Sequence, residues 1–350
     1  MNEIICTIGP SCADENTILK LSKAGVTIFR INLSHAPITD IAHYVKICNR
    51  HGLRLALDTE GAQLRTKLSK EYVTIKLGET GEIPLLNERR EAFTNLGLYP
   101  LSALKSISKG TSIRLDFNGA VIEIIETTEN YLRYKAISPG VVGHNKGVDL
   151  ISGNIDLPDF TDKDILALNH ALELGVNTVF LSFCKNQGSI AYIKNLVPDC
   201  RVIAKIESKK SIHELPSICS IADGILIDRG DLSREISILD IPFAQKGIVE
   251  FATKYSTPCY VATNVLESLI QGNIPTRAEL NDIVYSLDMG MSGIVLAAET
   301  AIGKFPVLSV EIVKEMMHRF RLHSNGLLFA DIDRNEITDP MMKVWLNRKH

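Results

Sequence analysis

The feature that most constrains the fold of this chain is an alternation between short apolar runs and segments with helical periodicity. The apolar runs are nearly continuous, which is typical of parallel strands that are buried on both faces. Eight such runs occur along the chain: Ile4–Ile8, Thr27–Leu33, Arg54–Asp58, Thr178–Phe183, Val202–Glu207, Gly224–Asp228, Pro258–Thr263 and Gly293–Glu299. Because eight strand-helix units close a parallel barrel, the pattern predicts an α/β fold of the (β/α)8 TIM-barrel type.

Helix-boundary signals support this reading. Glu15–Ala24 has helical periodicity and is followed by Gly25, a typical C-terminal cap. Two other segments begin close to a threonine that is followed three residues later by an acidic residue. This is the spacing of a capping box. These are Lys163–Leu174, introduced by Thr161 and Asp164, and Arg277–Met289, introduced by Thr276 and Glu279.

One stretch departs from the alternation. From about Lys67 to Asp156 the apolar residues switch to a period of two, which predicts strands of an antiparallel sheet. The clearest runs are Tyr72–Leu77, Ser112–Asp116, Ala120–Glu126 and Tyr131–Ile137. We therefore expect a barrel domain at residues 1–66 and 157–325, a small all-β lid domain at 67–156 after the third barrel strand, and a C-terminal tail at 326–350. A loop after a barrel strand emerges at the face where barrel enzymes keep their active sites, so the insert is placed to act as a lid.

Composition excludes several partners. The chain has 38 Lys and Arg against 41 Asp and Glu, a net charge of −3, so we expect no binding to nucleic acid or to an anionic membrane. No apolar run reaches the roughly 18 residues of a membrane span, and the N-terminus lacks a basic and apolar leader. The seven cysteines are odd in number and form no CxxC pair, which favours reduced thiols and a cytoplasmic location.

Polar residues gather at the C-terminal ends of the predicted strands. They are Arg30, Asn32 and Ser34; Asp58, Thr59 and Glu60; Lys205 and Glu207; Asp228, Arg229 and Asp231; Thr263 and Asn264; and Glu299 and Thr300. Buried charges are rarely left unpaired, because each unpartnered charge costs several kcal/mol. The pattern therefore indicates bound ions or ionic ligands at one end of the barrel. A set of salt bridges that closes the barrel is the alternative.

Lys205 and Glu207 lie two residues apart on one strand and face the same way, and Asp231 follows the next strand. Two carboxylates beside a lysine suit a divalent ion such as Mg²⁺, which takes one or two protein carboxylates and leaves positions for substrate oxygens. The lysine supplies a second positive charge to a developing oxyanion. A purely structural Lys205–Glu207 ion pair is the alternative, but it leaves Asp231 unexplained.

Other residues fit a phosphate substrate. Arg30 and Arg65 offer planar forks for phosphoryl oxygens. Thr263 is a hydroxyl able to relay a proton, and Gly230 permits a close backbone approach. Asn32, Ser34, Asp58 and Thr59 are oxygen donors suited to a second, larger cation, although capping roles are an equal alternative for Ser34 and Thr59. The chain contains neither GxxxxGK[ST] nor GxGxxG.

Taken together, these residues resemble pyruvate kinase over about residues 1–320. The motifs occur in family order: Ile5–Ser11, Phe29–His35, Ala56–Gly61, Leu64–Thr66, Asn145–Val148, Ile203–Glu207, Arg229–Leu232, Ala262–Ser268, Pro275–Glu279 and Ala298–Ala301. The resemblance implies Mg²⁺-dependent (or Mn²⁺-dependent) phosphoryl transfer from phosphoenolpyruvate to ADP, giving pyruvate and ATP.

The resemblance also implies roles for single residues. Glu207 and Asp231 would bind the divalent metal, and Gly230, Asp231, Thr263 and Lys205 the substrate. Catalysis would fall to Lys205, Arg30 and Thr263, and nucleotide binding to Arg30, Arg65, Lys146 and Asn32. Asn32, Ser34, Asp58 and Thr59 match the family's K⁺ site. A homodimer through the helix after Pro275–Glu279 is also implied.

Several positions depart from the family. Gln63 stands where a glutamate or a lysine is expected, Asp228 replaces a small residue, and Ala297-Ala298 replace a Ser-Gly pair. The chain ends at His350, so we expect no control through the family's C-terminal effector domain. Two other readings stay open at this point: an aldolase or lyase that uses a metal-bound pyruvate enolate, and a catalytically silent relative that binds a metabolite.

Overall fold

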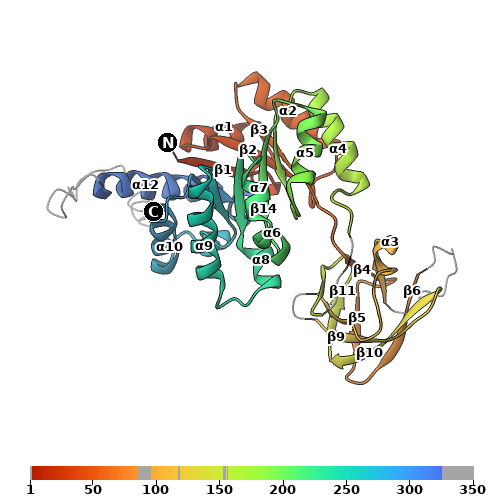
Figure 1. The fold of residues 1–350 in the computed structure, drawn as a ribbon. Helices are drawn as coiled ribbons and strands as arrows, with labels where there is room; N and C mark the ends of the chain where they lie inside the picture. The colour runs from red at the N-terminus through yellow and green to blue at the C-terminus, as the bar shows by residue number, and fades with distance from the viewer. Residues whose placement is uncertain (1, 86–95, 117–118, 153–154, 156, 325–350) are drawn as a thin grey trace. The chain divides into compact units, whose positions relative to one another are not determined.

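The computed structural model describes residues 2–85, 96–116, 119–152, 155 and 157–324. The chain divides into two compact units: Met1–Gly61 together with the chain from Phe160 onward, and Ala62–Asp159 (Figure 1). The expected tail at 326–350 lies outside the described residues. No helix in the described ranges is long and apolar enough to cross a membrane.

The first unit is a closed parallel barrel, with strand order β1-β17-β16-β15-β14-β13-β3-β2. Its strands are β1 Glu3–Thr7, β2 Ile28–Asn32, β3 Leu55–Asp58, β13 Thr178–Leu181, β14 Arg201–Ile206, β15 Gly224–Asp228, β16 Cys259–Ala262 and β17 Gly293–Leu296. Each lies within or next to one of the eight apolar runs. The prediction of a (β/α)8 barrel is confirmed.

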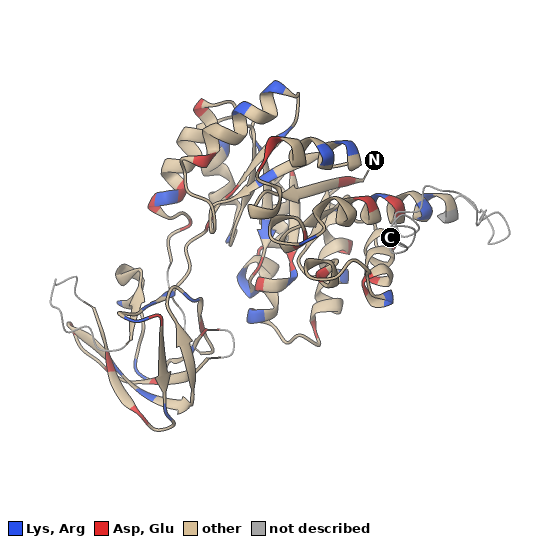
Figure 2. Cartoon of the chain, turned by 180° about the vertical axis from the view of Figure 1, so that it is seen from behind, with Lys and Arg blue, Asp and Glu red and all other residues tan. Residues whose placement is uncertain are grey.

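Helices surround the barrel (Figure 1). They are α1 Glu15–Ala24, α2 Asp40–Arg50, α4 Asp162–Glu173, α5 Gln187–Leu196, α6 Lys209–His213, α7 Leu215–Cys219, α8 Arg229–Glu235, α9 Ile241–Lys254, α10 Arg277–Asp288, α11 Ala298–Ala301 and α12 Pro306–Ser324, with short 3₁₀ turns at Pro10–Cys12 and Glu267–Ile270. Acidic and basic residues are interspersed over these helices (Figure 2).

The predicted helix boundaries have the expected local causes. Gly25 ends α1 with φ of 133°, a conformation that only glycine adopts without strain. Both predicted capping boxes form: Thr161 with Asp164 opens α4, and Thr276 with Glu279 opens α10.

The barrel has two buried layers. Side chains on the outer face of the strands pack under the helices in one large apolar cluster. The inward-facing apolar residues form a separate cluster: Ile5, Ile28, Ala56, Phe180, Ile203, Leu226, Tyr260, Ala262 and Val295. Since side chains alternate along a strand, a residue two positions further along the same strand also faces the barrel interior, nearer its C-terminal end.

The second unit is rich in strands. A five-stranded antiparallel sheet has the order β12-β8-β9-β10-β6, and two pairs, β11-β5 and β4-β7, accompany it. The bounds are β4 Arg65–Lys67, β5 Tyr72–Ile75, β6 Thr80–Pro84, β7 Gly97–Tyr99, β8 Ser112–Leu115, β9 Val121–Thr127, β10 Tyr131–Ser138, β11 Gly140–Gly143 and β12 Val148–Leu150, with a single-turn helix α3 at Leu101–Leu104. These strands enclose their own apolar core. The stretch that reads with period two is therefore β-structure, as predicted.

Candidate active site

A layer of polar side chains covers the apolar interior of the barrel. Two positions beyond Ile28, Ala56, Phe180, Ile203 and Leu226 lie Arg30, Asp58, Ser182, Lys205 and Asp228. All five side chains are buried. The alternation along five strands thus brings two cations, two acids and a hydroxyl into one layer.

Lys205 lies at the centre of this layer. Its Nζ is 2.7 Å from Glu207 Oε1, 3.5 Å from Asp228 Oδ2 and 3.6 Å from Asp58 Oδ1, and it donates a hydrogen bond of 3.1 Å to Ser182 Oγ. Burial alone would lower the pKa of Lys205, but the neighbouring carboxylates, Asp58 foremost, outweigh burial and raise that pKa above its usual value. Lys205 is therefore a fixed ammonium, suited to stabilise negative charge.

Arg30 is anchored by protein groups. Its Nη1 is 2.9 Å from Asp58 Oδ2, its Nη2 and Nε donate to Thr7 Oγ1, and the guanidinium lies 5.5 Å from the centre of the Phe180 ring. An arginine has five N–H groups. The contacts with Asp58 and Thr7 fix its orientation and leave N–H groups on Nη1 and Nη2 without another partner among the described residues, so Arg30 can still bind an anion.

Three carboxylates converge beside Lys205. Glu207, Asp228 and Asp231 each place one oxygen so that the three oxygens lie within 4.8 Å of one another. Burial, together with the charges of Asp231 and Asp228, raises the pKa of Glu207 to about 8 against the opposing effect of Lys205. Glu207 Oε2 accepts a hydrogen bond of 2.6 Å from the backbone N–H of Phe183. Such a set of hard oxygen donors fits a divalent cation.

Asp231 forms the rim of this cluster. Its side chain is 32% exposed, whereas that of Glu207 is fully buried. Asp231 Oδ1 pairs with Arg234 Nη1 at 3.2 Å. Burial and the charge of Asp228 raise the pKa of Asp231 despite Lys205 and Arg234. The carboxylate cluster is thus reachable from solvent on the Asp231 side.

Thr263 and Gly230 meet next to the cluster. Thr263 has φ of 69°, a strained conformation for a β-branched residue, and Asn264 follows with φ of 54°. The Thr263 hydroxyl accepts a hydrogen bond of 2.8 Å from the Gly230 backbone N–H and donates one of 2.6 Å to the carbonyl of Ala262. The strained backbone therefore lies where these two hydrogen bonds fix the Thr263 hydroxyl.

The four residues predicted to bind a larger cation follow β2 and β3. Asn32 and Asp58 are register partners on the two strands. Asn32 Oδ1 accepts a hydrogen bond from the Ser34 backbone N–H, and Thr59 Oγ1 accepts one from the Ser182 backbone N–H. The structure therefore pairs Asn32 with Asp58 on neighbouring strands, and it gives Asn32 and Thr59 hydrogen bonds within the protein.

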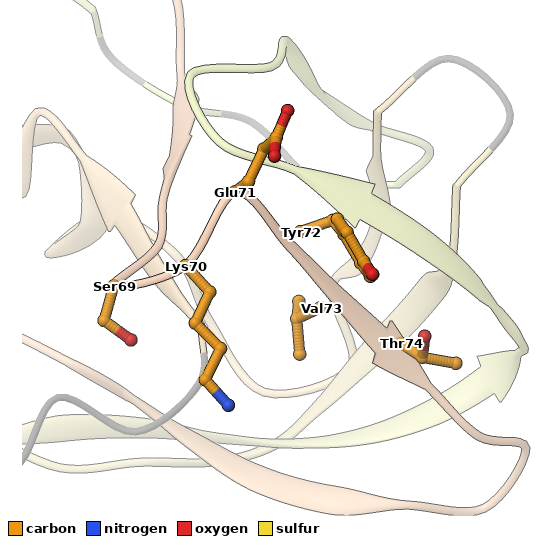
Figure 3. A pocket seen from close by; sticks show the side chains of 6 residues that line it. All are labelled: Ser69, Lys70, Glu71, Tyr72, Val73 and Thr74. Carbon is orange, nitrogen blue, oxygen red and sulfur yellow. The ribbon is translucent and has the colours of Figure 1, made fainter.

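Arg65 and Lys146 belong to the second unit. Thr66 and Lys146 are joined by a backbone hydrogen bond of 2.9 Å, and Arg65 Nη1 donates to the Asn145 carbonyl at 3.3 Å. These two cations, far apart in sequence, thus lie on adjoining segments of that unit. A pocket of about 390 Å³ in the same unit is lined by the side chains of Ser69–Thr74 (Figure 3) and includes neither of them.

Sequence reasoning missed two members of the polar layer. Ser182 bonds to both Lys205 and Asp58, and Thr7 holds Arg30. The signal that identifies them is the alternation itself, because each lies two residues after an inward-facing apolar residue, Phe180 or Ile5. The sequence places Asp228 at a strand end, and only the structure shows that it belongs to the carboxylate cluster.

Comparison with known proteins identifies the family of this chain. The sequence model of the family described as pyruvate kinase, barrel domain, matches residues 1–310 of this chain. The pyruvate kinase of Thermotoga maritima is 32% identical over 96% of this chain and 74% of its own length. Those of Thermococcus litoralis and Chlamydia pneumoniae are 30% and 28% identical, each over 90% of this chain and over 68% and 67% of their own lengths. With the family model matching most of its length, this chain belongs to the pyruvate kinase family.

Proposed function

We propose that this protein is a phosphotransferase that moves the phosphoryl group of phosphoenolpyruvate to ADP, giving pyruvate and ATP. The observation that carries the proposal is the meeting of Lys205, Glu207 and Asp231 at one end of the barrel of a pyruvate kinase family member. The curated relatives named above are pyruvate kinases, which does not favour a lyase or a silent binding protein.

The roles proposed for the barrel residues follow from their contacts. The transition state of phosphoryl transfer demands positioning and charge compensation more than covalent chemistry. Lys205 would stabilise the transferring phosphoryl group and the enolate oxygen, since its charge is permanent and its ammonium is fixed by several partners. Arg30 would bind the same phosphoryl group. Thr263 would supply the proton to the enolate, and Gly230 the close backbone approach to the substrate carboxylate.

Mg²⁺ or Mn²⁺ is the proposed metal, held by Glu207 and Asp231. The donor set supports this, because each of the two side chains presents an oxygen within 4.8 Å of an oxygen of Asp228. One oxygen of Asp228 is also buried without a hydrogen-bond partner among the described residues. When bound, the ion would polarise substrate oxygens as a Lewis acid. Asn32, Ser34, Asp58 and Thr59 are the proposed K⁺ ligands, supported by the pairing of Asn32 with Asp58 across β2 and β3.

Nucleotide binding is proposed for Arg30 and Asn32 in the barrel and for Arg65 and Lys146 in the second unit. We further propose a homodimer formed through α10, on which Val284 and Tyr285 expose 37% and 44% of their surfaces. A cytoplasmic location is supported by the seven cysteines, all of which are buried and reduced.

A coupled assay for ADP-dependent pyruvate formation tests the activity, with Mg²⁺ and K⁺ each present or omitted. Lys205→Met should lower kcat by about 10³-fold, because it removes a preorganised charge from the site. Lys209→Met is the matched control: Lys209 is exposed at the start of α6, and its replacement should leave kcat unchanged. Full activity in Lys205→Met would contradict the proposal.

A further inference from the structure

We propose that Asp228 is a third carboxylate ligand of the divalent cation, so that this chain binds the ion before any substrate is present. The proposal rests on the metal site of the proposed function and extends it to a residue that no comparison assigns. Glu207 follows the end of β14, Asp228 is the last residue of β15 and Asp231 lies in the first turn of α8. One oxygen of each lies within 4.8 Å of the others.

The carboxylate of Asp228 does not cap the helix that follows it. It occupies the N-cap position of α8, where an aspartate side chain normally accepts a hydrogen bond from the first turn of the helix. In this helix the side chain makes no such bond. The carboxylate of Asp228 has instead turned into the barrel.

The two oxygens of Asp228 have different surroundings. Oδ2 lies 3.5 Å from Lys205 Nζ. Oδ1 is buried and has no hydrogen-bond partner among the described residues, and Asp228 as a whole is only 7% exposed. Oδ1 faces the Gly230 and Thr263 side of the site, since a side-chain carbon added to Gly230 would lie 3.5 Å from both Oδ1 and Thr263 Oγ1. A buried carboxylate oxygen without a partner is costly, and a cation would remove that cost.

The charges around the cluster point the same way. Among the described residues, Lys205 is the ammonium that contacts Asp58, Glu207 and Asp228, and Arg30 pairs with Asp58. At the rim, Asp231 pairs with Arg234. The carboxylates of this group thus outnumber its cationic side chains, and a divalent ion compensates the excess negative charge. The carboxylates are Asp58, Glu207, Asp228 and Asp231, and the cations are Lys205, Arg30 and Arg234. Because Mg²⁺ and Mn²⁺ are usually held by one or two carboxylates plus water, a third carboxylate would replace one water and tighten binding in the absence of substrate.

Titration of the metal-free protein with Mn²⁺, followed by electron paramagnetic resonance without phosphate esters or nucleotide, tests this. The unmodified chain should bind one Mn²⁺, and Asp228→Ala and Asp228→Asn should each raise the Kd at least tenfold. The bound ion should also carry one more water in Asp228→Ala, measured from the line broadening or pulsed signal in ¹⁷O-enriched water. Glu235→Gln, an exposed residue at the end of α8, is the matched control and should change neither quantity.

Two results would overturn the inference: no Mn²⁺ binding without substrate, or the same Kd and the same number of waters after either Asp228 substitution. The second result would make Asp228 a counter-ion of Lys205 only. Melting temperatures measured in EDTA test whether each variant is folded. Because two variants are used, the test stays decisive if one of them does not fold. The pyruvate assay gives an independent result. If the unmodified enzyme is active but the Asp228 variants bind Mn²⁺ as it does, only the role of Asp228 is refuted. If the unmodified chain is inactive but Mn²⁺ binding changes as expected, only the kinase proposal is refuted.

Discussion

Charged residues are used differently at the two ends of the barrel. At the N-terminal end, Glu3 accepts from Arg201 at 2.9 Å and from Arg54 at 3.1 Å, and the Tyr260 hydroxyl also donates to it. Each oxygen of Glu3 is therefore satisfied by protein groups. At the C-terminal end, one oxygen of Asp228 has no hydrogen bond from any described residue. The first arrangement is complete without a ligand, whereas the second is suited to receive one.

Glu3 should make stability depend on pH in the acid range. Partial burial raises its pKa, but hydrogen bonds from Arg201 and Tyr260 and the arginine charges outweigh that effect, so the pKa lies below the ordinary 4.5. The folded state then binds this proton more weakly than the unfolded state, so the stabilisation is complete above the ordinary pKa and is lost as pH falls through the folded pKa. We expect Glu3→Gln to cost about 2 kcal/mol at neutral pH, and the difference from the unmodified chain to shrink between about pH 5 and pH 3.

Urea unfolding across that pH range measures this difference. Glu250→Gln is the control, because Glu250 is 68% exposed and only 3.9 Å from Lys246. A cost of Glu3→Gln that stays constant down to pH 3 would show that the carboxylate charge is not the source of the stabilisation.

At the level of secondary-structure elements, the capping box of α4 also makes contacts with a segment that is distant in the chain. Its capping box joins Thr161 and Asp164 as the sequence predicts. The Asp164 carboxylate also accepts hydrogen bonds from the backbone N–H groups of Glu60, at 2.7 Å, and Gly61, at 3.1 Å. Asp164 is fully buried. One side chain thus starts α4, the barrel helix between β3 and β13, and holds the segment that follows β3.

Substitutions in this box should therefore have unequal effects. Thr161→Ala removes one cap and should cost about 1 kcal/mol. Asp164→Ala also leaves the N–H groups of Glu60 and Gly61 without their acceptor, so we expect about 3 kcal/mol. Chemical denaturation at constant m-value measures both, with Thr276→Ala as a second single-cap reference. Equal losses for the two α4 variants would mean that the bonds to Glu60 and Gly61 contribute nothing.

At the scale of the whole molecule, the proposed chemistry is shared between two compact units. The carboxylates, Lys205, Arg30 and Thr263 belong to the barrel, and Arg65 and Lys146 belong to residues 62–159. The barrel also carries the surface proposed for self-association. Val284 and Tyr285 are exposed on α10, the helix opened by the second capping box.

The dimer proposal predicts the mass in solution. Sedimentation equilibrium at micromolar concentration should give twice the mass of one chain, because exposed apolar side chains on α10 would be buried between two copies. Tyr285→Glu should shift the mass toward that of a single chain. Tyr255→Glu, at an exposed tyrosine that follows α9, should leave the mass unchanged. A monomer in the unmodified protein would refute the proposal.

The sequence by itself determined the features that are encoded locally. The continuous apolar runs gave the eight strands, the period of two gave the β-structure of the second unit, and Thr-x-x-acid spacing gave the starts of α4 and α10, because each depends on the conformational preferences of neighbouring residues. It also placed Lys205 and Glu207 on one face of their strand, since alternation along a strand has a fixed period.

Only the tertiary structure decided which of the strand-end residues touch. Barrel closure and register place Lys205 against Asp58 and Asp228, direct Ser182 and Thr7 into the polar layer, and give Asp164 its partners at residues 60 and 61. These contacts join strands and loops that are distant in the chain, and their geometry follows from packing around a closed sheet rather than from any local preference. The tertiary structure also decides that the Asp228 side chain points toward the carboxylate cluster and not toward the first turn of α8.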